Sequence, residues 1–307
     1  MFDPLFFRLY MSPQIRSYAL PVAIVVGALF NGFFARWSFL SPYLIFAMLY
    51  ITFSRVSLSE LRVGWFHWVL LLFQIGLGAG LYFLLRDANE VVAQGVMICI
   101  FAPAAMASAV IGGMLGANVT TMTSFILMSN MSVALCAPVL FALTGGSGVE
   151  IGFWTMLWRV LKRVAPLLLM PLLLSWFTER FLPRTHAFVK AHQNLSFYLW
   201  VVVLTILMGN TTRFILSQPA DNYSVEITLA LSALVICLVQ FASGRWWGGR
   251  FDDKVAGGQS LGQKNMALAI WLTQSFLNPL ASVAPAAYVV WQNIVNSYQL
   301  WRKNKSA

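Results

Sequence analysis

The sequence predicts an all-α polytopic membrane protein, with ten transmembrane helices arranged as two inverted five-helix halves. Of its 307 residues, 59% are apolar and only 10% are charged, whereas soluble domains carry about 25% charged residues. The apolar residues also gather in segments of about 20 residues, the length that one helical span needs. This composition excludes a soluble globular enzyme and a disordered chain.

Ten apolar segments are expected to be the spans. They run over 17–35, 39–54, 66–86, 91–115, 118–144, 164–182, 194–217, 223–244, 259–278 and 280–300. The second is short, and the fourth and ninth are the least regular. The remaining residues make short loops and tails, which leave no room for a soluble domain of ordinary size.

The basic residues predict the orientation. With ten spans, both termini lie on one side of the membrane. That side holds 13 of the 20 lysines and arginines, and the other side holds six; the twentieth, Lys264, lies within the ninth segment and is counted on neither side. Cytoplasmic loops carry such an excess, so both termini are expected in the cytoplasm. Because the basic residues are scattered between apolar runs, no nucleic-acid partner is expected. We also expect no cleaved signal peptide, and three unpaired cysteines in apolar segments.

The two halves, 1–150 and 151–307, resemble each other. Each begins with an aromatic and basic stretch, 1–16 in the first half and 152–163 in the second. The third and eighth segments each carry one glutamine beside small residues, Gln74 and Gln240. Five spans per half is an odd number, so the halves insert in opposite directions, as in many secondary transporters. The alternative is that apolar segments look alike through composition alone.

The fourth and ninth segments are both interrupted. Pro103 lies among small residues in the fourth segment, and glycines and polar residues occupy 257–265 in the ninth. Irregular backbone at membrane depth is tolerated only where it is buried or lines a cavity. Matching interruptions in two halves therefore indicate a transport site. The alternatives are a simple proline kink at Pro103 and a solvent-exposed loop before a helix that starts near Asn265.

Four stretches together resemble the bile acid:sodium symporter family, within the bile/arsenite/riboflavin transporter superfamily. They are Gln74, residues 102–108 (APAAMAS), 262–268 (GQKNMAL) and 290–294 (VWQNI, similar to the family's VWHNI). The resemblance covers about 16–301. It implies that helices 4 and 9 are broken and cross. It also implies that a core domain of helices 3–5 and 8–10 moves against a panel domain of helices 1, 2, 6 and 7.

The chain departs from this family at the expected sodium ligands. The family uses a glutamate and a glutamine in the ninth span, and Ser260 and Lys264 stand in their places. Ser108 matches a serine ligand, but Ala109 replaces the asparagine beside it. Since a carboxylate is lost and an ammonium is gained, we hypothesise that Lys264 replaces a bound sodium ion.

Lys264 is also the only ionisable side chain expected in the membrane interior, because the acidic residues and histidines all lie in loops or at span ends. Such a group is a functional candidate by default. It could carry a coupling proton or pair with a substrate carboxylate. The alternative is that it extends to the cytoplasmic interface as a topology charge.

The candidate site residues follow from these comparisons. The expected substrate-binding residues are Asn265, Lys264, Ser108 and Thr123, the last from a fifth segment rich in small polar residues. The expected cation site, or its lysine replacement, consists of Gln74, Ser108, Ser260, Gln263 and Lys264. Asn265 is equally suited to cap the helix that follows it.

The resemblance implies a secondary transporter of a small organic anion, of the bile acid, pantoate or keto-acid class, working by alternating access. Ser260 and Lys264 argue against sodium coupling. The alternatives are a sodium-coupled symporter with a modified cation site and a membrane sensor on a transporter fold. An enzyme is not expected, because the sequence offers no acid–base pair at membrane depth. The expected partners are the substrate and the bilayer, with Na⁺ or H⁺ as the coupling ion, no cofactor, and a bacterial inner membrane as the location.

Overall fold

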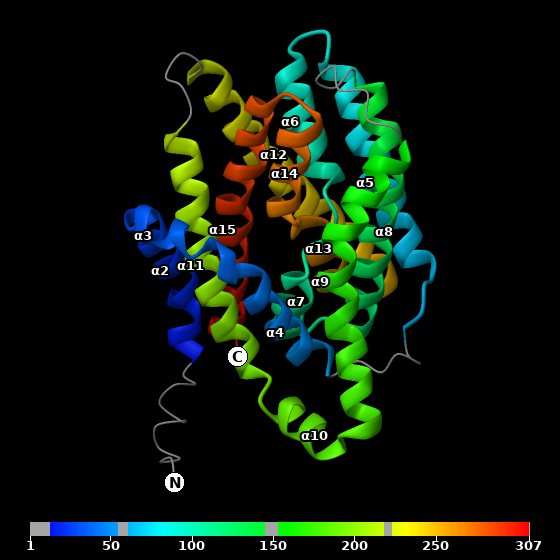
Figure 1. Cartoon of the computed structure of the whole chain (residues 1–307), viewed down its shortest axis with the longest axis vertical. Coiled ribbons are helices and arrows are strands. Elements are labelled where there is room, and N and C mark those ends of the chain that lie inside the picture. Colours follow the sequence, from blue (N-terminus) through cyan, green and yellow to red (C-terminus); the bar gives the residue numbers. More distant parts are fainter. Residues whose placement is uncertain (1–12, 55–60, 145–152, 218–222, 307) are drawn as a thin grey trace.

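The computed structural model describes residues 13–54, 61–144, 153–217 and 223–306 (Figure 1). Within these ranges every regular element is a helix, and an isolated antiparallel bridge joins Ala104 to Lys264. Four helical stretches in the described part are long and apolar enough to cross a membrane: Trp65–Leu85, Val119–Ala137, Asn194–Leu216 and Tyr223–Phe251. The molecule is therefore a helical protein whose longest apolar helices fit a membrane.

The helices of the first half follow the expected segments closely. They are α2 (Pro13–Leu29), α3 (Asn31–Arg36), α4 (Ser41–Phe53), α5 (Trp65–Leu85), α6 (Glu90–Phe101), α7 (Ala107–Leu115) and α8 (Val119–Leu143), with a short 3-10 turn, η1 (Ser38–Leu40). The first expected span is divided at Phe30, where the backbone leaves the helical region and the Asn31 side chain donates to the Ala28 carbonyl at 3.0 Å. The expected stretch 1–16 lies mostly outside the described residues.

The second half contains α9 (Phe153–Phe181), α10 (Pro183–Ala191), α11 (Asn194–Leu216), α12 (Tyr223–Gly248), α13 (Lys254–Gly262), α14 (Met266–Phe276) and α15 (Val283–Ser306), with 3-10 turns η4 (Gly249–Phe251) and η5 (Pro279–Ser282). Two predictions here were wrong. The sixth helix does not begin at 164, because α9 is continuous from Phe153 through the aromatic and basic stretch. Gly257 and Gly258 are not irregular, because they lie inside α13.

Side-chain caps explain where several helices begin. A side-chain oxygen at an N-cap satisfies one of the free amide groups of the first turn. The N-caps that accept such a bond are Asn89 for α6, Asn118 for α8, Asp253 for α13, Asn265 for α14 and Asn278 for η5. These short polar residues end the preceding loop and fix the starting residue of each helix within an otherwise apolar sequence.

The helices form two groups that face each other. In one group α11 packs on α2, α3 and α4, and α4 packs on α9. In the other group α12 packs on α6, α13 and α15, and α5 packs on α6. In Figure 1 the start of α2, the end of α15 and the short α10 all lie toward the lower side. The two groups enclose the interrupted segments, which meet in the middle of the molecule.

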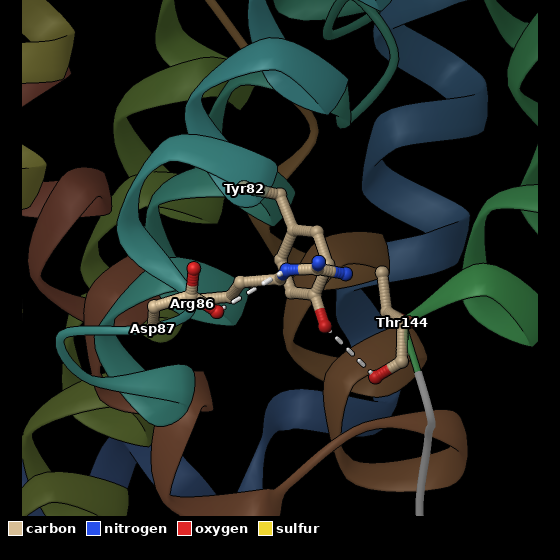
Figure 2. A network of polar contacts seen from close by, with 4 residues as sticks. All are labelled: Tyr82, Arg86, Asp87 and Thr144. Atoms are coloured by element: carbon tan, nitrogen blue, oxygen red, sulfur yellow. Dashed lines mark hydrogen bonds and ion pairs between the residues drawn. The ribbon is translucent and has the colours of Figure 1, made fainter.

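Polar contacts fix the ends of α5 and α8 to each other (Figure 2). The Tyr82 hydroxyl near the end of α5 donates to the carbonyl of Thr144, directly after α8, at 3.0 Å. One turn further on, the Arg86 Nε atom lies 3.5 Å from an Asp87 carboxylate oxygen. The Tyr82 bond is buried, so it is the contact that holds these two helix ends together at the upper side of the molecule.

Candidate functional site

The two interrupted segments are hydrogen-bonded to each other. The chain leaves the helical conformation between α6 and α7 and again between α13 and α14. The Ala105 amide donates to the Gln263 carbonyl at 2.8 Å, and the Asn265 amide donates to the Pro103 carbonyl at 2.9 Å. Residues 101–107 and 256–264 are buried. The simple proline kink and the solvent-exposed loop are therefore both wrong, and we refer to this meeting point as the crossing.

Side chains from α5 and α8 stabilise the first break. The Gln74 Nε2 atom donates to the carbonyls of Phe101 and Ala102 at 2.9 and 3.1 Å. Ser129 donates to Gln74 Oε1 at 3.2 Å and accepts from the Ala104 amide at 3.1 Å. The last carbonyls of a helix have no intrahelical partner. The Gln74 amide group, predicted as a cation ligand, thus satisfies the end of α6.

Side chains from α12 and α15 stabilise the second break. The Tyr288 hydroxyl donates to the Gly262 carbonyl at 3.0 Å, and Gln240 Nε2 donates to Tyr288 and to the Cys99 carbonyl at 2.9 and 3.1 Å. Gln292 Oε1 accepts from the Lys264 amide at 2.9 Å. Gln292 thus bonds directly to the second break, whereas Gln240 reaches it only through Tyr288 and bonds directly to α6 beside the first break.

Several buried polar atoms at the crossing have no hydrogen-bond partner among the described residues. They are Lys264 Nζ, Ser260 Oγ, Gln263 Nε2 and Ser108 Oγ. The Lys264 side chain is only 1% exposed, so it does not extend to a surface. It lies close enough to the buried Cys99 thiol for the two groups to interact electrostatically. The crossing thus carries a lysine amine, an amide nitrogen and hydroxyl oxygens that the described part of the protein leaves without a bond.

The other charged groups lie away from the crossing. Where side chains are described, no aspartate, glutamate or arginine is buried as a whole residue, although one carboxylate oxygen of Glu226 is buried without a partner. Glu90 and Glu226 lie in the first turns of α6 and α12. His67 is buried, but it bonds locally: its Nδ1 accepts from the Gly64 amide at 3.0 Å, and its Nε2 lies 3.1 Å from the Thr121 carbonyl. The expected acids Asp3, Glu60, Glu150 and Asp221 fall outside the described residues.

A cavity of about 730 Å³ separates the crossing from α4, α9 and α11. Its wall at the crossing includes Gln263, Lys264, Asn265 and Gln292. Its opposite walls are largely apolar and aromatic, with Met48 from α4 and Trp200 from α11. Small-molecule sites have this size and this combination of a few polar groups with apolar walls. The cavity can therefore hold a small amphipathic molecule against the crossing.

The structure brings some of the predicted site residues together and separates others. Gln263, Lys264 and Asn265 line the cavity, while Ser108 and Ser260 are buried behind it. Asn265 also caps α14, accepting from the Leu268 amide at 3.1 Å, so its alternative role is present as well. Thr123 is buried in α8, where its hydroxyl donates to the Val119 carbonyl at 2.8 Å, and it does not line this cavity.

The sequence indicates only some of the residues that support the crossing. Ser129 and Asn130 belong to the polar set of the fifth segment, some of which is expected to face the interior, whereas Tyr288 and Asn296 lie outside that set. All four bond to the main chain or to the side chains of the crossing. Their signal in the sequence is the presence of amide and hydroxyl side chains inside otherwise apolar helices. Within the described residues, no group of three or more His, Cys, Asp or Glu side chains is placed to hold a metal ion.

No model of a protein family matches the chain, and no curated protein is significantly similar to it.

Proposed function

We propose that this protein is a secondary transporter that carries a small organic anion by alternating access. The observation that carries this proposal is the pair of interrupted helices, bonded to each other beside a cavity of about 730 Å³ and with a buried lysine where they meet. Secondary transporters bind their substrates at discontinuous helices in the middle of the membrane. The resemblance of this sequence to the bile acid:sodium symporter family supports the same function.

The proposed architecture has ten spans in two inverted halves. The core domain consists of α5–α8 and α12–α15, and the panel domain consists of α2–α4, α9 and α11. Two features support this division: the most extensive helix contacts lie within these groups, although α2 also packs on α15 and α9 on α8, and the cavity lies between the groups. Movement of one group against the other opens the cavity to either side in turn. Both termini are proposed to lie in the cytoplasm, because of the excess of basic residues on their side.

The polarity of the cavity favours an anion. The first residues of α7 and α14 both line it, with Ala107 from α7 and Met266 from α14. Helix N-termini carry unbonded amide groups and a partial positive charge, which attract carboxylates. Lys264 lines the same cavity and adds a positive charge when its amine is protonated. The apolar walls then bind the nonpolar body of the substrate.

The coupling proposal concerns Lys264. A sodium site needs several oxygen ligands, by analogy with other hard cations. Ser108 and Ser260 supply hydroxyl oxygens that have no partner among the described residues, and the amine of Lys264, at the same crossing, is buried without a partner as well. Two cations a few ångströms apart in a low-dielectric interior repel each other strongly. Lys264 is thus proposed to take the place of a sodium ion.

Uptake into vesicles tests the proposed function. The purified protein is reconstituted and offered radiolabelled bile acid, pantoate and keto acid under imposed pH and sodium gradients. We expect saturable uptake of at least one of these anions. Asn265→Ala should lower that uptake at least tenfold, because it removes a polar group at the cavity wall. The matched control is Asn278→Ala, which removes the same kind of cap from η5 and should leave uptake unchanged.

Two outcomes contradict the proposal. One is a folded protein that takes up none of the three anions under any gradient. The other is saturable binding of an anion without transport, which would instead indicate a sensor built on this fold.

A further inference from the structure

The helices α13 and α15 face each other with a stripe of amide side chains. Gln259 and Gln263 are four residues apart on the first segment, and Gln292, Asn296 and Gln299 follow at intervals of four and three on the second. Such intervals place side chains on one face of a helix. We call these five residues the amide stripe. The stripe extends from the crossing toward the end of α15.

Hydrogen bonds connect four of the five residues of the amide stripe to one another. Asn296 donates to Gln263 Oε1, and Gln259 Nε2 donates to Asn296 Oδ1 at 3.0 Å and to Gln299 Oε1 at 3.1 Å. At the crossing, Gln292 accepts from the Lys264 amide. Gln259, Gln263 and Asn296 are buried, whereas Gln299 is partly exposed. The bonded part of the stripe therefore runs from Gln263, the residue before Lys264, to the molecular surface near the end of α15, on the lower side in Figure 1.

Several polar atoms in the stripe and on its neighbours are unsatisfied. Gln259 Oε1 and Gln263 Nε2 of the stripe are buried and have no partner among the described residues, and the same holds for Ser260 Oγ, Lys264 Nζ and Asn293 Oδ1 on adjoining residues of the two segments. Nearly all buried polar groups in proteins are bonded to protein or to ordered water. Leaving one without a partner costs free energy. A purely structural ladder of amides would leave fewer of these atoms unbonded.

The chemistry of the unsatisfied atoms identifies what would bond to them. Lys264 Nζ and Gln263 Nε2 are donors, whereas Gln259 Oε1 and Asn293 Oδ1 are acceptors. A metal ion satisfies only acceptors, and an anion satisfies only donors. Water both donates and accepts, and a buried water makes about three hydrogen bonds. A mixed set of donors and acceptors along one stripe is therefore suited to water.

We propose that a file of internal water molecules lies along the amide stripe and joins Lys264 to the surface at Gln299. Through such a file one proton crosses when each water accepts a proton from one neighbour and donates another to the next. Proton exchange at the Lys264 amine by this route rests on the proposed transport function. The presence of the water does not depend on that function. The titratable groups packed around the crossing are the thiols of Cys99 and Cys237 and the phenol of Tyr288.

Hydroxyl-radical footprinting tests the proposal, because radicals made from internal water modify the side chains beside that water. Tyr288 is the reporter, since it is fully buried and bonds to Gly262 at the crossing. Phe125 is the reference, since it is equally buried in a different cluster of the core. In the wild type we expect Tyr288 to be modified at least ten times faster than Phe125.

Variants of the stripe make the test specific. Asn296→Leu removes the central amide at similar volume and should slow the modification of Tyr288 at least fivefold. Gln259→Met interrupts the stripe one step nearer the surface and serves if the first variant does not fold. Ser297→Ala is the matched control, because its hydroxyl bonds only to the Asn293 carbonyl among the contacts recorded for it.

The proposal is overturned if Tyr288 and Phe125 are modified at equal rates in the wild type. It is also overturned if neither stripe variant changes the rate at which Tyr288 is modified. Because modification is measured without any transport, a protein that fails to transport an anion still gives a clear result for the water.

Discussion

Two glutamine side chains, Gln74 and Gln240, hold main-chain atoms at or beside the helix breaks. Gln74 donates to two carbonyls at the end of α6, and Gln240 acts on the end of α13 through Tyr288. A buried polar group that loses its partner costs about 1–3 kcal/mol. These side chains therefore make the interrupted backbone possible in an apolar environment.

Replacement of Gln74 by leucine removes both of these donors at nearly constant volume. Gln74→Leu is expected to lower the free energy of unfolding by about 2–5 kcal/mol, because two buried carbonyls lose their donor. Thermal unfolding in detergent measures this effect. The matched control is Gln274→Leu, because Gln274 is exposed and lies at the cavity. An unfolding temperature that Gln74→Leu leaves unchanged would show that the bonds to Phe101 and Ala102 do not stabilise the break.

At the scale of elements, α12 and α13 approach each other through glycines. A Cβ atom added to Gly257 would lie 2.2 Å from the Gly244 carbonyl oxygen, and one added to Gly244 would lie 2.3 Å from the Gly257 carbonyl oxygen. Small residues permit such close contact between helices in membranes. This contact positions α13, and with it the second half of the crossing.

Gly257→Ala is therefore expected to destabilise the protein by about 1–3 kcal/mol, the usual cost of overpacking. The matched control is Gly80→Ala in α5, where an added Cβ would meet no atom within 4 Å among the described residues. This control should be neutral or slightly stabilising, since alanine favours helix over glycine. Equal unfolding temperatures for the two variants would contradict the close packing of α12 on α13.

For the whole molecule, the sequence predicts where the helices lie better than where they stop. Most expected segments agree with helices to within a few residues, because apolar length alone defines them. The charged residues Lys162 and Arg163 predict that the sixth span begins after them, yet α9 continues through them, since long basic side chains reach the interface without breaking a helix. The glycines around Gly257 predict irregular backbone, yet packing on α12 keeps Gly257 helical, because tertiary contacts override local preference.

The candidate site was predictable only in part, for a related reason. The crossing segments carry local signals, such as Pro103 and the polar run around Lys264. The side chains that support the crossing carry no such local signal, because each bonds to a residue far away in the sequence. Gln240, for example, bonds to Cys99 across 141 positions. Such pairings depend on the packing of whole helices. Spacing along one helix cannot reveal which helix lies opposite.

The measurement that tests the central claim most directly is thermal unfolding of the purified protein in sodium chloride and in choline chloride at equal ionic strength. If Lys264 takes the place of a sodium ion, the wild type shows no sodium-specific stabilisation. Lys264→Gln gains one, worth about 2.7 kcal/mol when sodium is at a hundredfold excess over its Kd. Lys254→Gln, which removes an exposed lysine at the start of α13, gains none. A sodium-specific rise in the wild type would contradict the claim, because a cation site would then exist alongside the lysine.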